Sequence, residues 1–211
     1  MMNQLTLGTP CLHAENLECV RSDRLLFSGL NFELGRGQLL HVAGANGCGK
    51  TSLLRMLCGL SQPAAGEVRW RGQPLWSERH RFLNELAYLG HHLGVKGELT
   101  ALENLVLASR LYRTRAGADP GQILICAGLG GHADTPARAL SAGQRQRIAL
   151  ARLLLQEAVL WVLDEPFTSL DQDGIAWVRT LLEEHLERGG IVVMTSHQLV
   201  PVQAEVLTLQ L

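Results

Sequence analysis

Residues 44–52 read Gly44-Ala45-Asn46-Gly47-Cys48-Gly49-Lys50-Thr51-Ser52. Their spacing, G-x-x-x-x-G-K-[ST], is that of a loop whose backbone N–H groups surround a phosphate group. Glycine suits such a loop because a side chain would block the close approach of the backbone. The apolar run at 39–43 predicts a buried strand, and residues 50–57 predict a helix whose positive N-terminal end faces the same anion. The pattern indicates a nucleotide site, with Lys50 on the β- and γ-phosphates and the Thr51 hydroxyl on Mg²⁺.

The composition is that of an ordinary globular protein. The chain has 211 residues, of which 46% are hydrophobic and 18% charged. The formal net charge of -1 provides no basic field of the kind that binds DNA or RNA, so we expect no nucleic-acid partner. No apolar run approaches the roughly 20 residues that cross a bilayer, and residues 1–15 lack the features of a secretory signal. We therefore expect contact with a membrane only through partner proteins.

The cysteines favour a reducing compartment. The five cysteines are scattered along the chain without a C-x-x-C pair. Their odd number, and the position of Cys48 inside the phosphate loop, favour free thiols in a cytosolic compartment over a disulfide framework.

Beyond the loop, the pattern predicts an α/β chain. Residues 11–34 alternate apolar and polar side chains around a turn at Ser22-Asp23, which predicts antiparallel strands. From about residue 77 to residue 139 strand patterns vanish and helical periodicity takes over. We expect a single domain over residues 1–211, with a helical subdomain at about 77–155 inserted in the α/β core. The apolar runs at 158–163 and 191–195 then predict central strands of a parallel sheet.

Polar residues follow both of these apolar runs. Asp164 and Glu165 come directly after the first, at the strand end where α/β sheets bind ligands. We expect Asp164 to hold Mg²⁺, directly or through water, and Glu165 to orient or deprotonate the attacking water. His197 follows the second run, where it can contact the γ-phosphate and position the water.

A second phosphate-binding surface is predicted at Ser141-Ala142-Gly143-Gln144, which precedes a helical pattern. Serine and glycine at a helix start present a hydroxyl and unpaired backbone N–H groups, with the helix dipole behind them. One protomer cannot place this surface on its own phosphate loop.

This segment resembles the LSGGQ signature of ATP-binding cassette (ABC) ATPases, with Ala142 in place of the usual glycine. The resemblance covers nearly the whole chain, and the motifs occur in the family's order: phosphate loop, signature, the Walker B pair Asp164-Glu165, the D-loop Ser169-Leu170-Asp171 and the switch histidine His197. It implies the P-loop NTPase fold, with a parallel core sheet, an N-terminal antiparallel β subdomain and a helical subdomain. It also implies Mg²⁺-dependent hydrolysis of ATP to ADP and phosphate by a head-to-tail homodimer. ATP would lie between residues 44–52 of one protomer and Ser141, Ala142, Gly143 and Gln144 of the other, with the D-loop Asp171 also at the nucleotide.

Two positions depart from the family's pattern. Arg21 stands where these ATPases usually carry an aromatic residue that stacks on adenine; its planar guanidinium can stack instead, or the adenine is held more loosely. His91 stands where the Q-loop glutamine should lie, in the segment that senses the γ-phosphate and contacts the membrane partner. A histidine there would bring pH dependence.

Several stretches look like the ATP-binding subunits of cytochrome c maturation complexes, the heme exporter ATPases: residues 26–30, 90–96, 99–105, 163–168 and 189–198. This resemblance implies a peripheral subunit on the cytoplasmic face of the bacterial inner membrane, bound to the membrane subunit CcmB, with CcmC and CcmD in the wider complex. ATP hydrolysis would energise heme handling or release of the heme-loaded chaperone. The alternatives are the ATPase subunit of another small ABC transporter with a different cargo, and a soluble ABC-type ATPase that acts on nucleic acid or the ribosome.

Overall fold

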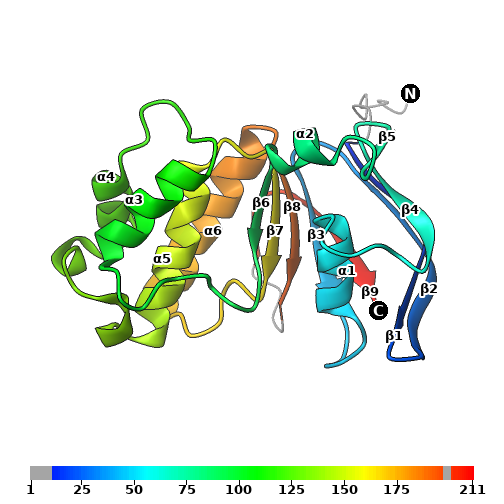
Figure 1. Ribbon diagram of the computed structural model, residues 1–211, viewed down its shortest axis with the longest axis horizontal. Coiled ribbons are helices and arrows are strands. Elements are labelled where there is room, and N and C mark those ends of the chain that lie inside the picture. The colour runs from blue at the N-terminus through cyan, green and yellow to red at the C-terminus, as the bar shows by residue number, and fades with distance from the viewer. Residues whose placement is uncertain (1–10, 197–200) are drawn as a thin grey trace.

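Two β-sheets of different type form the body of the protein (Figure 1). The computed structural model describes residues 11–196 and 201–211. The core sheet has five strands in the order β6-β7-β8-β3-β9, and every neighbouring pair is parallel. Its strands are β3 (Gln38–Ala43), β6 (Leu86–Leu89), β7 (Leu160–Asp164), β8 (Ile191–Thr195) and β9 (Glu205–Gln210). The predicted α/β fold with a parallel core sheet is confirmed.

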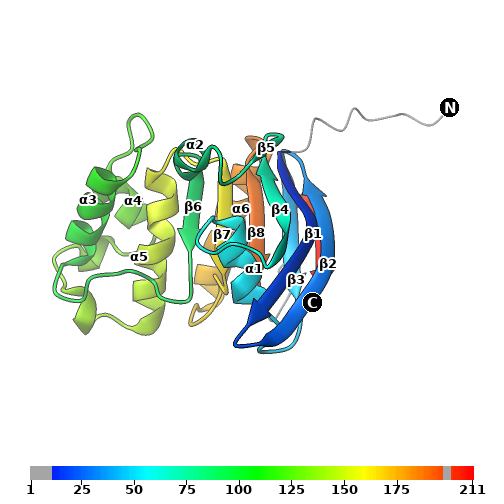
Figure 2. The same cartoon turned by 45° about the vertical axis from the view of Figure 1, so that its right-hand side comes forward.

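The second sheet is antiparallel and lies at the opposite side of the molecule from most helices (Figure 2). Its order is β2-β1-β4-β5, with strands β1 (Leu12–Arg21), β2 (Arg24–Leu34), β4 (Ala65–Trp70) and β5 (Gln73–Pro74). The turn between β1 and β2 is at Ser22 and Asp23, whose φ angles of 49° and 60° are left-handed. The expected antiparallel region over residues 11–34 is therefore confirmed.

The helices pack in two places. α1 (Lys50–Leu57) lies between the two sheets, and its buried Leu53, Leu54 and Leu57 join residues of both sheets in one hydrophobic cluster. α3 (Ala101–Leu111), α4 (Pro120–Cys126) and α5 (Ala142–Leu155) form a group with its own apolar cluster beyond the core sheet, and α6 (Gln172–Glu187) packs with α5 on that sheet. A short helix, α2 (Arg79–Leu83), and two 3-10 turns, Gly130–His132 and Ala137–Ala139, complete the fold. None of the helices within the described ranges has the length and apolar character needed to span a bilayer.

One expectation about the helical region is wrong. Strand β6 lies inside residues 77–139, where the pattern predicted no strand, and it pairs in parallel with β7 at the edge of the core sheet. β6 is four residues long, and only Ala87 and Leu89 of it are fully buried. So short a strand leaves little periodicity in the sequence. It forms because it pairs with β7 and packs in the hydrophobic cluster that also contains residues of α5.

Candidate nucleotide-binding site

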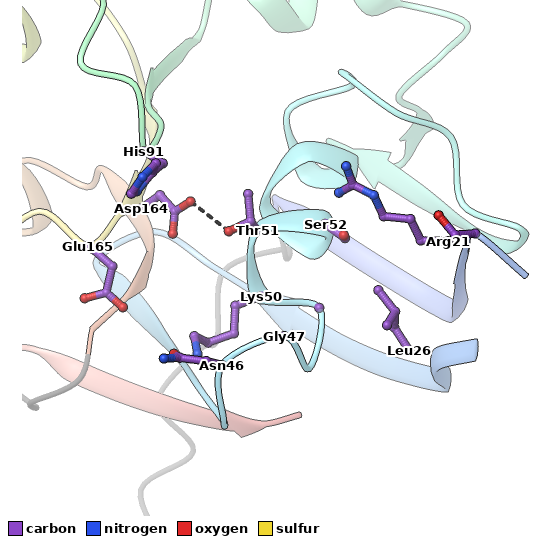
Figure 3. Close-up of a pocket in the computed structure, with 12 residues that line it drawn as sticks. Arg21, Leu26, Asn46, Gly47, Lys50, Thr51, Ser52, His91, Asp164 and Glu165 are labelled. Carbon is purple, nitrogen blue, oxygen red and sulfur yellow. Dashed lines mark hydrogen bonds between the residues drawn. The ribbon is translucent and has the colours of Figure 1, made fainter. Parts of the chain in front are cut away.

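A pocket of ≈ 590 Å³ lies around the phosphate loop and the carboxyl end of β7 (Figure 3). Its walls come from segments that are far apart in the sequence. The residues that line the pocket are Arg21, Ser22, Leu26, Asn46, Gly47, Gly49, Lys50, Thr51, Ser52, His91, Asp164 and Glu165. The fold therefore brings most of the predicted loop residues together with the acidic pair, Arg21 and His91. The remaining loop residues Gly44, Ala45 and Cys48 are not among those that line it.

The start of α1 is built to receive an anion. Gly49 is the N-cap with a left-handed φ of 113°, and it supplies no side-chain cap. A Cβ on Gly49 would also lie 3.1 Å from the ring of Phe27, so the tight turn needs glycine. The other long helices differ, since side chains accept hydrogen bonds at the starts of α3, α5 and α6. The first N–H groups of α1, together with the helix dipole, can therefore bind a phosphate group.

Lys50 lies over this loop. Its Nζ donates hydrogen bonds to the backbone oxygens of Gly44 at 2.7 Å and Ala45 at 3.1 Å. Figure 3 shows the side chain running from the start of α1 toward Asn46. The ammonium group thus lies on the pocket side of the loop, where it can neutralise phosphate charge.

Thr51 and Asp164 meet across the pocket floor. The Thr51 hydroxyl donates to Oδ2 of Asp164 at 3.0 Å, although the residues come from α1 and β7 (Figure 3). Mg²⁺ prefers oxygen ligands and is held by one or two protein oxygens together with substrate phosphates, so this pair fits Mg²⁺. The part of the chain that the structure describes contains no cluster of three or more His, Cys, Asp or Glu side chains suited to a metal.

Glu165 has an unusual backbone. Its φ of 54° is left-handed, a conformation uncommon for a residue with a side chain. Its N–H donates to the hydroxyl of Thr195 at 2.9 Å, and the same hydroxyl donates to Oδ1 of Asp164 at 2.7 Å. Thr195 was not among the predicted site residues. The signal for it was present, because it is the one polar residue of the run at 191–195 and ends the strand next to Asp164.

The signature residues lie elsewhere. Ser141 is the N-cap of α5: its Oγ accepts from the N–H of Gln144 at 3.1 Å, and its own N–H donates to Oε1 of Gln144 at 2.9 Å. Ser141 and Ala142 are exposed, and none of residues 141–144 lines the pocket. The predicted helix start is confirmed, and it belongs to a second surface of the same chain.

The D-loop is part of this second surface. A Cβ on Gly143 would lie 2.5 Å from the backbone oxygen of Ser169, so only glycine permits the close approach. Asp171 caps α6 and accepts a hydrogen bond from Nη2 of Arg147 at 2.6 Å. The N–H of Gly174 and the Arg147 guanidinium hold the pKa of the Asp171 carboxyl below its usual value. Arg147, which sequence reasoning missed, thus joins the signature helix to the D-loop.

Three predicted residues need separate mention. Arg21 lines the pocket and its side chain extends toward Ser52 (Figure 3). His91 also lines the pocket, with the ring of His92 at a centroid distance of 5.6 Å. His197 lies outside the described residues. Adenine stacking by Arg21, γ-phosphate sensing by His91 and the switch role of His197 stay predictions.

A phosphate loop at the start of a helix, with carboxylates at the end of a strand in the same sheet and a separate signature helix, defines an ATPase of the ABC class. A family model described as ABC transporter matches residues 27–168. The chain is 57% identical to the Methylococcus capsulatus cytochrome c biogenesis ATP-binding export protein CcmA over 203 residues, which are 95% of this chain and 97% of that protein. It is 49% identical over 187 residues to the Escherichia coli (strain K12) protein of the same name, with 89% of each chain covered. The chain therefore belongs to the CcmA family of ABC transporter ATP-binding proteins.

Solved structures agree on the fold. A putative ABC transporter ATP-binding protein from Pyrococcus furiosus superposes with a TM-score of 0.79, covering 95% of this chain and 96% of that one. Its sequence identity is 24%, so the likeness concerns the fold alone. The expected ABC ATPase fold and the resemblance to cytochrome c maturation ATPases are both confirmed.

Proposed function

We propose that this chain is the ATP-hydrolysing subunit of an inner-membrane ABC complex for c-type cytochrome biogenesis, and that it acts as a homodimer. The name of its curated relatives, cytochrome c biogenesis ATP-binding export protein, supports the biological process. One observation supports the proposed dimer: residues of the phosphate loop and the acidic pair line the pocket, but none of residues 141–144 does. A second copy is needed to bring an exposed signature surface to the nucleotide.

In the proposed dimer, ATP lies between residues 44–52 of one protomer and residues 141–144 of the other. The Ser141 hydroxyl accepts from Gln144 within its own chain, which leaves its hydrogen to donate to a phosphate oxygen. The γ-phosphate is then shared by two helix N-termini, α1 of one copy and α5 of the other. Hydrolysis removes this shared charge, so the two copies separate.

The chemistry is mostly positioning and charge stabilisation. The loop N–H groups and Lys50 bind the β- and γ-phosphates. Thr51 and Asp164 would hold Mg²⁺, which neutralises charge on the phosphate oxygens. Glu165 orients or deprotonates the attacking water, and His197 contacts the γ-phosphate. Arg21 and His91 take the places of the adenine-stacking and Q-loop residues.

In the proposed complex, partner proteins attach the ATPase to the membrane. We assign CcmB as the membrane subunit that binds the ATPase dimer, with CcmC and CcmD in the wider complex, and a peripheral position on the cytoplasmic face of the inner membrane. We further propose that the whole chain is one ABC ATPase domain, in which α3, α4 and α5 form the helical subdomain. Hydrolysis would energise heme handling or release of the heme-loaded chaperone.

Glu165→Gln tests the proposed hydrolysis. The variant should bind ATP and form a stable dimer, while phosphate release falls by at least about 100-fold because the water has lost its base. Size-exclusion chromatography with and without ATP measures the dimer. Glu187→Gln, an exposed glutamate at the end of α6, is the matched control and should behave as the wild type. If Glu165→Gln released phosphate at the wild-type rate, the role proposed for Glu165 in activating the water would be wrong.

Membrane attachment is tested by co-expression. The protein should sediment with membranes when CcmB is present and stay in the supernatant without it. Sedimentation that does not depend on CcmB would contradict the partner assignment.

A further inference from the structure

We propose that Thr195 is a positioning residue for ATP hydrolysis, which fixes the Asp164 carboxylate and the backbone of Glu165 relative to the phosphate loop. This inference rests on the roles proposed above for Asp164 and Glu165. It concerns a buried residue outside the lining of the pocket, which acts through its two hydrogen-bond partners, Asp164 and Glu165.

Thr195 stands at the junction of the strands that carry the site. It is the last residue of β8, and it is paired with Asp164 of β7 on one side and with Val42 of β3 on the other. β3 leads into the phosphate loop, and β7 ends at the acidic pair. The side chain is fully buried, with a relative exposure of 0%. A polar group in such a place has to be satisfied within the protein.

Its hydroxyl makes two hydrogen bonds whose directions are determined. The N–H of Glu165 can only donate, so Oγ1 accepts it at 2.9 Å. The hydroxyl hydrogen then points to Oδ1 of Asp164 at 2.7 Å, and an ionised carboxylate can only accept. Oδ2 of the same carboxylate is left facing Thr51 at 3.0 Å. Thr195 therefore sets the plane of the carboxylate and turns one defined oxygen toward the Thr51 hydroxyl.

The same hydroxyl supports the left-handed backbone of Glu165. A residue with a side chain keeps a φ of 54° only where its surroundings enforce it. The bond from the Glu165 N–H to Thr195 supplies such a constraint at the point where β7 ends. Without it, the amide lacks its acceptor and the backbone can relax toward an ordinary negative φ, which would turn the Glu165 side chain away from its place in the pocket.

The residue type fits both duties. Threonine is β-branched and suits a buried strand, and its hydroxyl supplies one donor and two acceptor positions. Valine has nearly the same shape without the hydroxyl, and serine keeps the hydroxyl without the methyl group. Thr195→Val and Thr195→Ser therefore separate the hydrogen bonds from the packing.

Steady-state kinetics give the first readout. Thr195→Val should lower kcat by about 10- to 100-fold, the usual effect of losing a residue that orients a ligand. The dissociation constant for ATP in EDTA should stay within about two-fold, since ground-state binding by the loop is untouched. Thr195→Ser should restore kcat to within a few-fold of the wild type. Thr180→Val, on the exposed side of α6, is the matched control and should change neither quantity.

Hydrogen exchange of the Glu165 amide gives a readout that needs neither metal nor turnover. Exchange should become at least about ten-fold faster in Thr195→Val and stay near the wild-type rate in Thr195→Ser, because only valine removes the acceptor. If Thr195→Val does not fold, Thr195→Ala is compared with Thr195→Ser by the same two measurements.

The outcomes separate this inference from the proposed function. The positioning role is overturned if the wild type is active and Thr195→Val keeps its full kcat. It is also overturned if Thr195→Val and Thr195→Ser lose kcat equally. Both results leave the ATPase assignment intact. Parallel loss of kcat and of ATP affinity in Thr195→Val also overturns it, because that result describes a structural role. A wild-type protein that binds ATP and hydrolyses none, with partner present, overturns the proposed function itself.

Discussion

His185 is expected to make the fold less stable as the pH falls below 6.5. The ring lies on α6, is almost fully buried, and stacks on Trp161 with ring centroids 3.8 Å apart and an interplanar angle of 7°. Its Nε2 lies 3.1 Å from the backbone oxygen of Val159. Burial away from water disfavours the charged ring and lowers the pKa of His185 to about 4, from an ordinary value of 6.5.

The sign and size of the effect follow from these two pKa values. The folded protein keeps His185 neutral down to about pH 4, whereas the unfolded chain takes up a proton near pH 6.5. The stabilising contribution is thus complete above pH 6.5 and is lost as the pH falls through the window from 6.5 to 4. Each pH unit in that window removes about 1.4 kcal/mol. The loss is therefore about 2 kcal/mol at pH 5 and about 3 kcal/mol at pH 4.

Urea unfolding at pH 7 and pH 5 measures the effect, with His185→Gln as the reference. Glutamine does not titrate, and its amide can donate to the Val159 oxygen, so the variant lacks the loss of stability that the wild type suffers from this histidine between pH 7 and pH 5. The difference in unfolding free energy between the wild type and the variant should shrink by about 2 kcal/mol from pH 7 to pH 5. If the difference is the same at both pH values, His185 is not held neutral by burial and the reasoning is wrong.

Three further predictions concern the packing and the site. Gly190→Ala places a Cβ against the His185 ring, so urea unfolding should show a loss of about 1–3 kcal/mol, whereas Gly131→Ala, with no atom within 4 Å, should be nearly neutral; equal losses would contradict the clash. Asn104→Ala removes four hydrogen bonds between the side-chain amide and backbone groups of residues 96–100, and should lower the melting temperature through a loss of about 3 kcal/mol. His91→Ala should reduce ATPase activity and its stimulation by the membrane partner; an unchanged phosphate-release rate with and without partner would show that His91 does not occupy the Q-loop position.

Local sequence patterns were sufficient for most elements. The helix over residues 50–57 and the strand over 191–195 lie where the pattern placed them, because apolar periodicity and the phosphate loop determine both locally. The capping box that starts α3, between Thr100 and Glu103, is equally local, since it needs only residues within one turn. β6 was missed because four residues carry too little periodicity, and its partner β7 lies about seventy positions further along the chain.

The sequence by itself determined the chemical groups of the nucleotide site: the glycine-rich loop, the acidic pair and the helix-capping signature are short motifs whose function follows from local geometry. Only the tertiary structure decided which of them share a pocket. Parallel strands from distant segments end at one edge of the sheet, so Thr51 meets Asp164 there, and Thr195 holds the acidic pair from the next strand. The same packing directs the signature of α5 to another surface, because α5 packs with the helical group instead of against the loop. Such juxtapositions depend on contacts between residues far apart in the chain, which no local pattern encodes.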